Sequence, residues 1–94
     1  MIKVQITEKG IRMEGHAGHV KEGQDIVCAA ISALTCSLIN ALEDLTANRI
    51  RAETGSGWTL IQWEKLDEFG RLLVDAWYLA IMDIHRERPC IEIR

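Results

Sequence analysis

The sequence MIKVQITEKGIRME (residues 1–14) decides the fold, because apolar and polar residues alternate along it with the period of a β-strand. Apolar residues occupy every second position over residues 2–6. Charged residues and a glycine at 8–10 form a turn, and the alternation resumes over 11–14. The pattern predicts a hairpin of two half-buried strands.

Working outward along the chain, helix and strand patterns follow one another in a simple order. Residues 26–45 contain no helix breaker, and a helical apolar period runs from Leu66 until Pro89 ends it. Shorter alternating segments predict strands over 50–53, 58–63 and 91–94. We therefore expect a single α+β domain over residues 1–94, with two helices packed on one face of a mostly antiparallel sheet of about five strands.

Burial of the helices is predicted from their apolar faces. The first helix has apolar residues on nearly all sides, so we expect it to be central and largely buried. The apolar stripe of the second helix, with Phe69, Leu73 and Trp77, is expected to be core or dimer surface. Two tryptophans that flank a strand, Trp58 and Trp63, should serve as core. An aromatic-lined substrate subsite is the less favoured interpretation of these tryptophans.

Composition restricts the class of function. Lys and Arg number 11 against 14 Asp and Glu, a net charge of −3 with no basic run, which disfavours a nucleic-acid-binding protein. The sequence shows no secretory signal, and we expect no apolar run that approaches the length of a membrane span. Three widely spaced cysteines favour neither a disulfide framework nor a four-cysteine zinc site, and they indicate a cytoplasmic protein. A chain of 94 residues buries only about two thirds of the surface that its unfolded form exposes, so a second subunit is expected to add stability.

The segment GHAGHVKEGQDIVC (residues 15–28) carries the candidate chemistry. Its first nine residues are rich in glycine and lack periodicity, which predicts a loop. Asp25 suits a helix N-cap, and Cys28 would then lie in the first turn beside unpaired backbone N–H groups that favour a thiolate. A loop histidine, His16, could take the thiol proton, and the same N–H groups could stabilise an oxyanion.

Other interpretations of these residues remain open at this point. A lone cysteine at a helix start is more often a packing residue than a nucleophile. His16, His19 and Cys28 could instead hold zinc, although one ligand is missing from the usual set of four. A third interpretation is a non-catalytic assembly factor that binds a structural protein through its sheet edge.

The remaining cysteines and the third histidine are predicted to be structural. Cys36 lies eight residues along the same helix as Cys28, and Cys90 lies by the final strand. We expect both to be inert core thiols. His85 falls in the last turn of the second helix, where the helix dipole favours a cation.

Gly15-His16-Ala17 followed by Gly23-x-Asp25-Ile26-Val27-Cys28 resembles the signature of the bacterial ribosomal-processing cysteine proteases, the Prp family. The length of the chain, the opening hairpin, the long helix after the cysteine, and the closing helix and strand are also similar. The resemblance implies a cofactor-free and metal-free cysteine endopeptidase in which Cys28 is the nucleophile and His16 the general base.

The resemblance also implies partners and supporting residues. Family members remove a short N-terminal extension from large-subunit ribosomal protein number twenty-seven during ribosome assembly, and they are homodimers. A phage-encoded relative would instead process a capsid or scaffold protein. The loop between the two catalytic residues would close over substrate, and Asp25 is expected to cap the helix and order that loop, whose other members are Gly15, Ala17, Gly18, His19 and Gly23.

Overall fold

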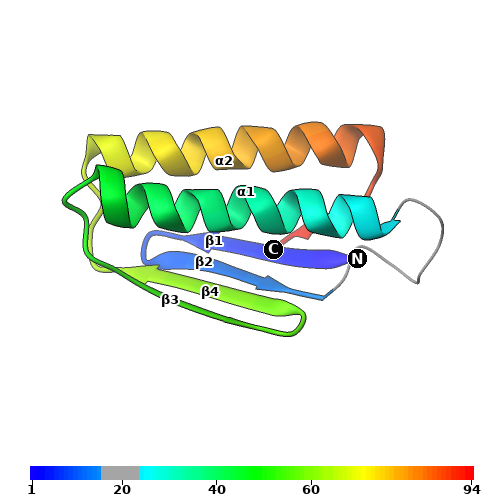
Figure 1. Cartoon of the computed structure of the whole chain (residues 1–94), viewed down its shortest axis with the longest axis horizontal. Coiled ribbons are helices and arrows are strands. Elements are labelled where there is room, and N and C mark those ends of the chain that lie inside the picture. The colour runs from blue at the N-terminus through cyan, green and yellow to red at the C-terminus, as the bar shows by residue number, and fades with distance from the viewer. Residues whose placement is uncertain (16–23) are drawn as a thin grey trace.

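The computed structural model describes residues 1–15 and 24–94 and contains the elements in the predicted order (Figure 1). Both helices, both hairpins and the final strand lie within a few residues of their predicted positions. The elements are β1 (Ile2–Thr7), β2 (Gly10–Glu14), α1 (Gln24–Leu45), β3 (Ile50–Gly55), β4 (Trp58–Trp63), α2 (Glu68–Glu87) and β5 (Ile91–Ile93).

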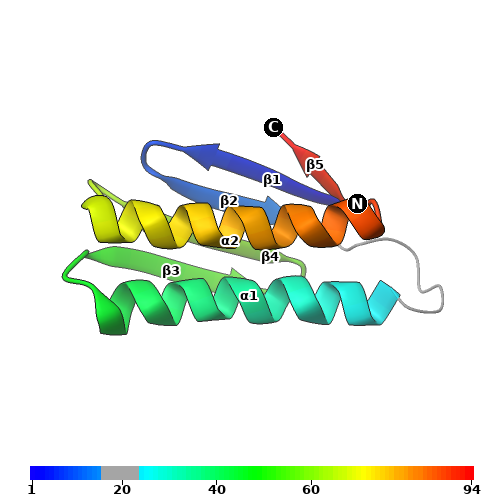
Figure 2. The ribbon, with the colours of Figure 1, turned by 90° about the horizontal axis from the view of Figure 1, so that it is seen from above.

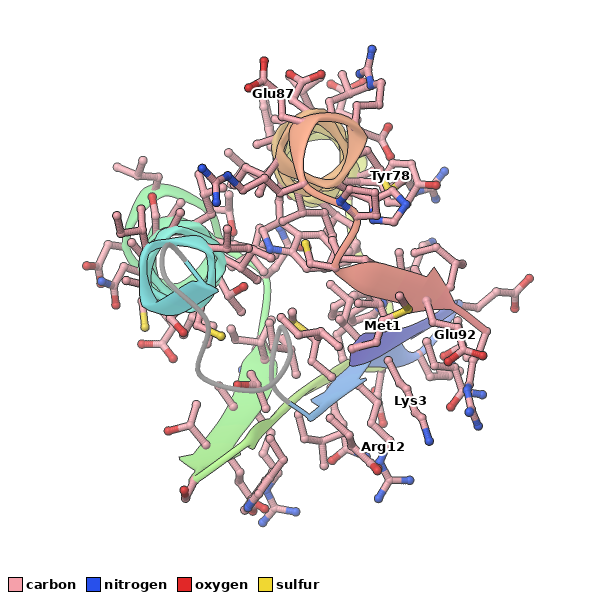
Figure 3. The ribbon with its side chains drawn as sticks, turned by 90° about the vertical axis from the view of Figure 1, so that its right-hand side faces the viewer. Met1, Lys3, Arg12, Tyr78, Glu87 and Glu92 are labelled. Atoms are coloured by element: carbon pink, nitrogen blue, oxygen red, sulfur yellow. The ribbon has the colours of Figure 1, made fainter. Side chains whose placement is uncertain are left out.

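The five strands form one sheet in the order β3-β4-β2-β1-β5. Neighbouring strands are antiparallel except for β1 and β5, which are parallel. Both helices cover the same face of the sheet, as Figure 2 shows from above. On the opposite face, Lys3 and Arg12 extend away from the helices (Figure 3). The predicted α+β architecture is confirmed.

The hydrophobic core fills the layer between the helices and the sheet. Its most buried side chains come from both layers, so the helices pack against the strands. They are Val4, Ile11 and Ile61 from the sheet and Leu42 and Ile81 from the helices. Alternation along β1, β2 and β4 therefore directs one side chain in two into the core, as the sequence pattern predicts.

Helix α1 is less buried than expected. Val27, Ile31 and Leu38 lie in the core, but Ile26 is 73% exposed and Leu45 is 78% exposed. Figure 2 gives the reason, because α1 forms one flank of a two-helix layer and has only α2 beside it. The prediction of a central, largely buried helix is therefore wrong, since apolar residues on all sides of a helix do not require contacts on all sides.

The prediction that no apolar run approaches the length of a membrane span is also wrong. Ile26–Leu45 comprises 20 residues of mean hydropathy 1.8, which is long and apolar enough to cross a membrane. The core helix of a folded domain meets the same criteria, and the inner face of α1 packs against the sheet.

Helix α2 begins with a side-chain cap that positions its buried face. Asp67 accepts a hydrogen bond from the Gly70 N–H at 2.9 Å, and its own N–H donates to the Asn48 side chain at 2.9 Å. The buried stripe contains Gly70 and Trp77, whereas Phe69 is 63% exposed. Of the two places predicted for this stripe, core or dimer surface, Trp77 lies in the core and Phe69 lies on the surface. Gly70 faces inward against Asn48, which turns the preceding residue toward solvent.

The tryptophans differ in their surroundings. Trp63 is buried as predicted, and its indole N–H donates to the Glu8 carbonyl at 2.8 Å. Trp77 is also buried, and its indole N–H donates to the Thr35 hydroxyl at 3.1 Å. Trp58 is 43% exposed at the start of β4, so its predicted place in the core is wrong. The Trp58 indole lies against Gly55, and Trp58 lines a cavity between α1 and the sheet together with Thr59.

Candidate active site

A cavity of about 260 Å³ lies between the first half of α1 and the sheet, beside the turn that joins β3 to β4. Figure 3 views the molecule from this end, with α1 above the β3–β4 side of the sheet. Cys28 and Ile31 contribute to its wall from α1, and Met13, Gly15 and Thr54 contribute from the sheet. The thiol at the start of the helix therefore faces a space that a ligand can enter.

Cys28 is half-buried and is the fifth residue of α1. The helix begins at Gln24, two residues earlier than expected, so Asp25 belongs to the first turn, and the capping role of its side chain stays a prediction. Gln24 is a good helix former, and nothing in the sequence prevents the helix from including it. The Cα–Cβ bonds of a helix tilt toward its N-terminus, so the Cys28 thiol still leans toward the backbone N–H groups of the first turn.

Gly15 is held firmly at the edge of the cavity. Its N–H donates to the Gly57 carbonyl at 2.8 Å, and its φ of +100° is one that L side chains rarely adopt. A Cβ atom at this position would lie 2.7 Å from the Met1 carbonyl oxygen, which is closer than real contacts allow. The residue that precedes His16 is therefore fixed against both the N-terminal strand and the β3–β4 turn.

The other predicted loop residues (His16, Ala17, Gly18, His19 and Gly23) lie outside the described residues. The dyad, the closure of the loop and the zinc alternative thus remain predictions. Among the residues that the structure describes, no group of three His, Cys, Asp or Glu side chains could hold a metal ion.

The remaining cysteines differ from one another. Cys90 is buried as predicted, and burial raises the pKa of its thiol, with a further rise from the negative charge of a Cys28 thiolate. Cys36 is exposed and lines the same cavity as Cys28, so its predicted place in the core is wrong. Eight residues along a helix leave a rotation of about 80° between the two side chains, which turns Cys36 out of the buried stripe.

His85 has a structural role, as predicted. Its Nδ1 atom accepts hydrogen bonds from the N–H groups of Cys90 and Ile91, both at 3.0 Å. His85 joins the end of α2 to the start of β5.

The β3–β4 turn is the part of the site that the sequence does not reveal. Gly57 and Thr59 line the cavity, and Gly57 supplies the acceptor for Gly15. A glycine-containing turn after a short strand indicates a hairpin and nothing more. Its position beside Cys28 depends on the pairing of β2 with β4, which joins segments more than 40 residues apart in the chain.

The chain matches the family described as cysteine protease Prp over residues 1–91. It belongs to the Prp family. Two curated Prp relatives, each named ribosomal processing cysteine protease and each from a Staphylococcus aureus strain, are 44% identical to the chain over 55 residues. That alignment covers 52% of the chain and 52% of each relative, so it spans about half of their length.

Solved structures resemble the Prp fold over nearly the whole chain. A Streptococcus mutans protein has a TM-score of 0.87 and 29% identity, covering 100% of this chain and 96% of its own. S. aureus Prp with a substrate peptide has a TM-score of 0.83 and 23% identity. The same protease with a covalently linked product peptide has 0.81 and 24%, and both cover 99% of this chain and 95% of theirs. At this identity, the two S. aureus structures establish the fold alone.

Proposed function

We propose that this chain is a cysteine endopeptidase in which Cys28 is the nucleophile and His16 the general base. The observation that carries the proposal is the cavity that Cys28 and Gly15 line together, in a chain that matches the Prp family over residues 1–91. Gly15 is covalently joined to His16, so the attachment point of the proposed base borders the same cavity as the proposed nucleophile.

The proposed reaction uses groups at both ends of the loop. His16 takes the proton from the Cys28 thiol, and the thiolate attacks the scissile carbonyl carbon. Backbone N–H groups in the first turn of α1 stabilise the oxyanion. The carbon–nitrogen bond breaks, the leaving amine takes the proton from His16, and water then hydrolyses the thioester to a carboxylate and the free thiol.

The proposed substrate is the N-terminal extension of large-subunit ribosomal protein number twenty-seven. The names of the S. aureus relatives, which describe ribosomal processing, support this assignment at 44% identity. A ribosomal substrate also implies that the protein acts in the cytoplasm. A phage-encoded protein with a capsid substrate would have the same site chemistry, so the substrate must be tested directly.

We further propose that the chain forms a homodimer through the outer face of α2. Phe69, Leu72 and Leu79 are between 62% and 66% exposed and recur at helical spacing on one face of that helix. Scattered exposed apolar residues are normal on a monomer, but a stripe of three large side chains along one helix is typical of a contact surface. A second copy of the chain would bury this stripe against itself.

The direct test is incubation with a synthetic peptide that spans the extension and the mature start of the ribosomal protein, followed by mass spectrometry. Wild-type protein is expected to give two products. Cys28→Ala and His16→Ala should each reduce cleavage by at least about 10³-fold, because neither half of a nucleophile–base pair works alone. Cys36→Ala and His19→Ala are the matched controls, from the same helix and the same loop, and should retain most activity.

Three outcomes would contradict the proposal. Cleavage that persists in a folded Cys28→Ala variant would exclude this thiol as the nucleophile. Full biological activity of Cys28→Ser would support the non-catalytic assembly factor, and stoichiometric zinc in chelator-free protein would support the metal-binding alternative.

A second test measures the reactivity of Cys28 itself. Because Cys36 is exposed, a thiol alkylator will label it as well, so the rate must be measured in a Cys36→Ser background. Cys90 is buried and its pKa is raised, so it should react slowly near neutral pH. Labelling of Cys28 is expected to be abolished by prior incubation with the peptide. Labelling that the peptide does not affect would show that the peptide binds elsewhere.

A further inference from the structure

The two edges of the sheet differ in their relation to the active-site cavity. Strand β3 forms one edge, and among the described residues it pairs only with β4. Its end lines the cavity through Thr54 and Gly55. Strand β5 forms the other edge, is only three residues long, and contributes no residue to the cavity wall. A ligand that pairs with the sheet next to Cys28 must therefore use β3.

The register of the hairpin identifies which main-chain groups of β3 are available. Ser56 and Gly57 form a two-residue turn, so the flanking pair Gly55 and Trp58 exchanges hydrogen bonds. Such a hydrogen-bonded pair recurs at every second residue, so the N–H and C=O groups of Glu53 and the other odd-numbered residues of β3 bond to β4. The N–H and C=O groups of the even-numbered residues then point away from the sheet, and no hydrogen bond from them to another described element is present.

The side chains of these same residues face the helix layer. Ile50 and Ala52 are half-buried, Thr54 lines the cavity, and the intervening Arg51 and Glu53 are exposed. Strand alternation thus places the free main-chain groups and the inward side chains on the same three residues. A strand added to this edge would have its own inward side chains beside theirs, between α1 and the sheet.

We infer that the substrate peptide binds as an added sixth strand on β3, which brings its backbone past Ala52 and Thr54 to the thiol of Cys28. This inference rests on the proposed function and specifies the conformation in which that site binds its substrate. Main-chain hydrogen bonds to β3 supply affinity, and every second side chain of the peptide enters the cavity. The opposite side chains of the peptide face away from the helices and contribute little to selectivity.

The test is a backbone N-methyl scan of the ribosomal peptide, with binding to the Cys28→Ala variant measured by fluorescence anisotropy. Methylation removes one N–H at a time without changing a side chain. Methylation at alternate positions is expected to weaken binding by about tenfold each, and methylation at the positions between them should have little effect. Loss at consecutive positions, or no loss anywhere, would overturn the added strand.

A protein variant tests the same edge from the other side. Ala52→Pro removes an N–H that faces away from β4, which an edge strand tolerates, and should weaken peptide binding by about tenfold. Ala52→Ser keeps the N–H and is the matched control. Unchanged binding by a folded Ala52→Pro variant would also overturn the inference. If the alternate pattern is found in binding but the wild-type protein does not cleave the peptide, the proposed protease function is contradicted and the added strand is supported. Failure of the proposed function can therefore be distinguished from failure of this inference.

Discussion

At the scale of single residues, the most informative contact is the buried pair of Thr35 and Trp77. The Thr35 hydroxyl accepts from the indole N–H at 3.1 Å and donates to the Ile31 carbonyl at 2.8 Å, and both side chains are 4% exposed. The pair joins α1 to α2 by a hydrogen bond inside an otherwise apolar layer. A buried donor without a partner costs more than the hydrogen bond itself contributes.

We therefore expect Thr35→Val to lower the free energy of unfolding by about 1–3 kcal/mol, because the indole N–H loses its acceptor. Trp77→Phe alone is a poor comparison, since it also removes ring volume. The informative variant is Thr35→Val combined with Trp77→Phe, whose cost should be less than the sum of the two single changes. Urea unfolding of the four proteins measures the coupling, and strictly additive costs would exclude it.

His85 provides a second prediction at this scale. His85→Leu leaves the N–H groups of Cys90 and Ile91 without their acceptor, and should lower the free energy of unfolding by about 1–3 kcal/mol. His85→Asn offers an amide oxygen in a similar place and should lose less. Thermal unfolding compares the two variants. If both lose the same stability, the acceptor role of the imidazole is excluded.

The sequence identifies the residue types of the site but not their surroundings. The glycine-rich loop and the Gly-His-Ala and Asp-Ile-Val-Cys motifs are visible in the sequence alone, and Cys28 lies in the cavity wall. The exposure of Cys36 and the acceptor role of His85 could not be predicted. The exposure of Cys36 depends on how α1 is rotated about its axis. The role of His85 depends on the N–H groups that follow α2.

At the scale of elements, the cap of α2 makes stability depend on pH. The pKa of Asp67 is lowered from 3.8, first by the Gly70 N–H and then by the Asn48 side chain. A carboxyl group whose pKa is lowered in the folded state stabilises the fold at pH values above its ordinary pKa. That stabilisation is lost as the pH falls through the lowered value.

We expect the wild-type protein to lose stability more steeply than Asp67→Asn as the pH falls below about 5. Asparagine is also a good N-cap, so the variant keeps the hydrogen bonds and removes only the titration. Urea midpoints measured over that pH range give the two slopes. Parallel slopes would show that the charge on Asp67 does not contribute.

Strands are easier to predict than helix environments, for a physical reason. Side chains on a strand alternate between two faces, so the pattern in 2–6 and 11–14 determines both the element and its buried side. A helix that is apolar on all sides, such as α1, has no such marker. Asp67 precedes an apolar helical segment, as Asp25 does, and its role as a cap follows from its hydrogen bonds with Gly70 and Asn48.

At the scale of the whole molecule, the exposed stripe on α2 predicts the oligomeric state. The wild-type protein should sediment as a dimer at micromolar concentration, and Leu72→Glu should shift it to the monomer because a charge would be buried at the contact. Ile93→Glu is the matched control, since Ile93 is 45% exposed on the edge strand β5. A wild-type protein that remains monomeric at tens of micromolar would exclude this surface as a stable dimer interface.

The hydrogen bond between Gly15 and Gly57 has a consequence for insertions. The turn at Ser56–Gly57 is only two residues long, and one of them supplies the carbonyl that holds the chain just before His16. A longer turn would move that carbonyl away from Gly15 and release the segment that leads to the proposed base. We therefore expect epitope tags or loop extensions at this hairpin tip to abolish turnover while the sheet itself still assembles.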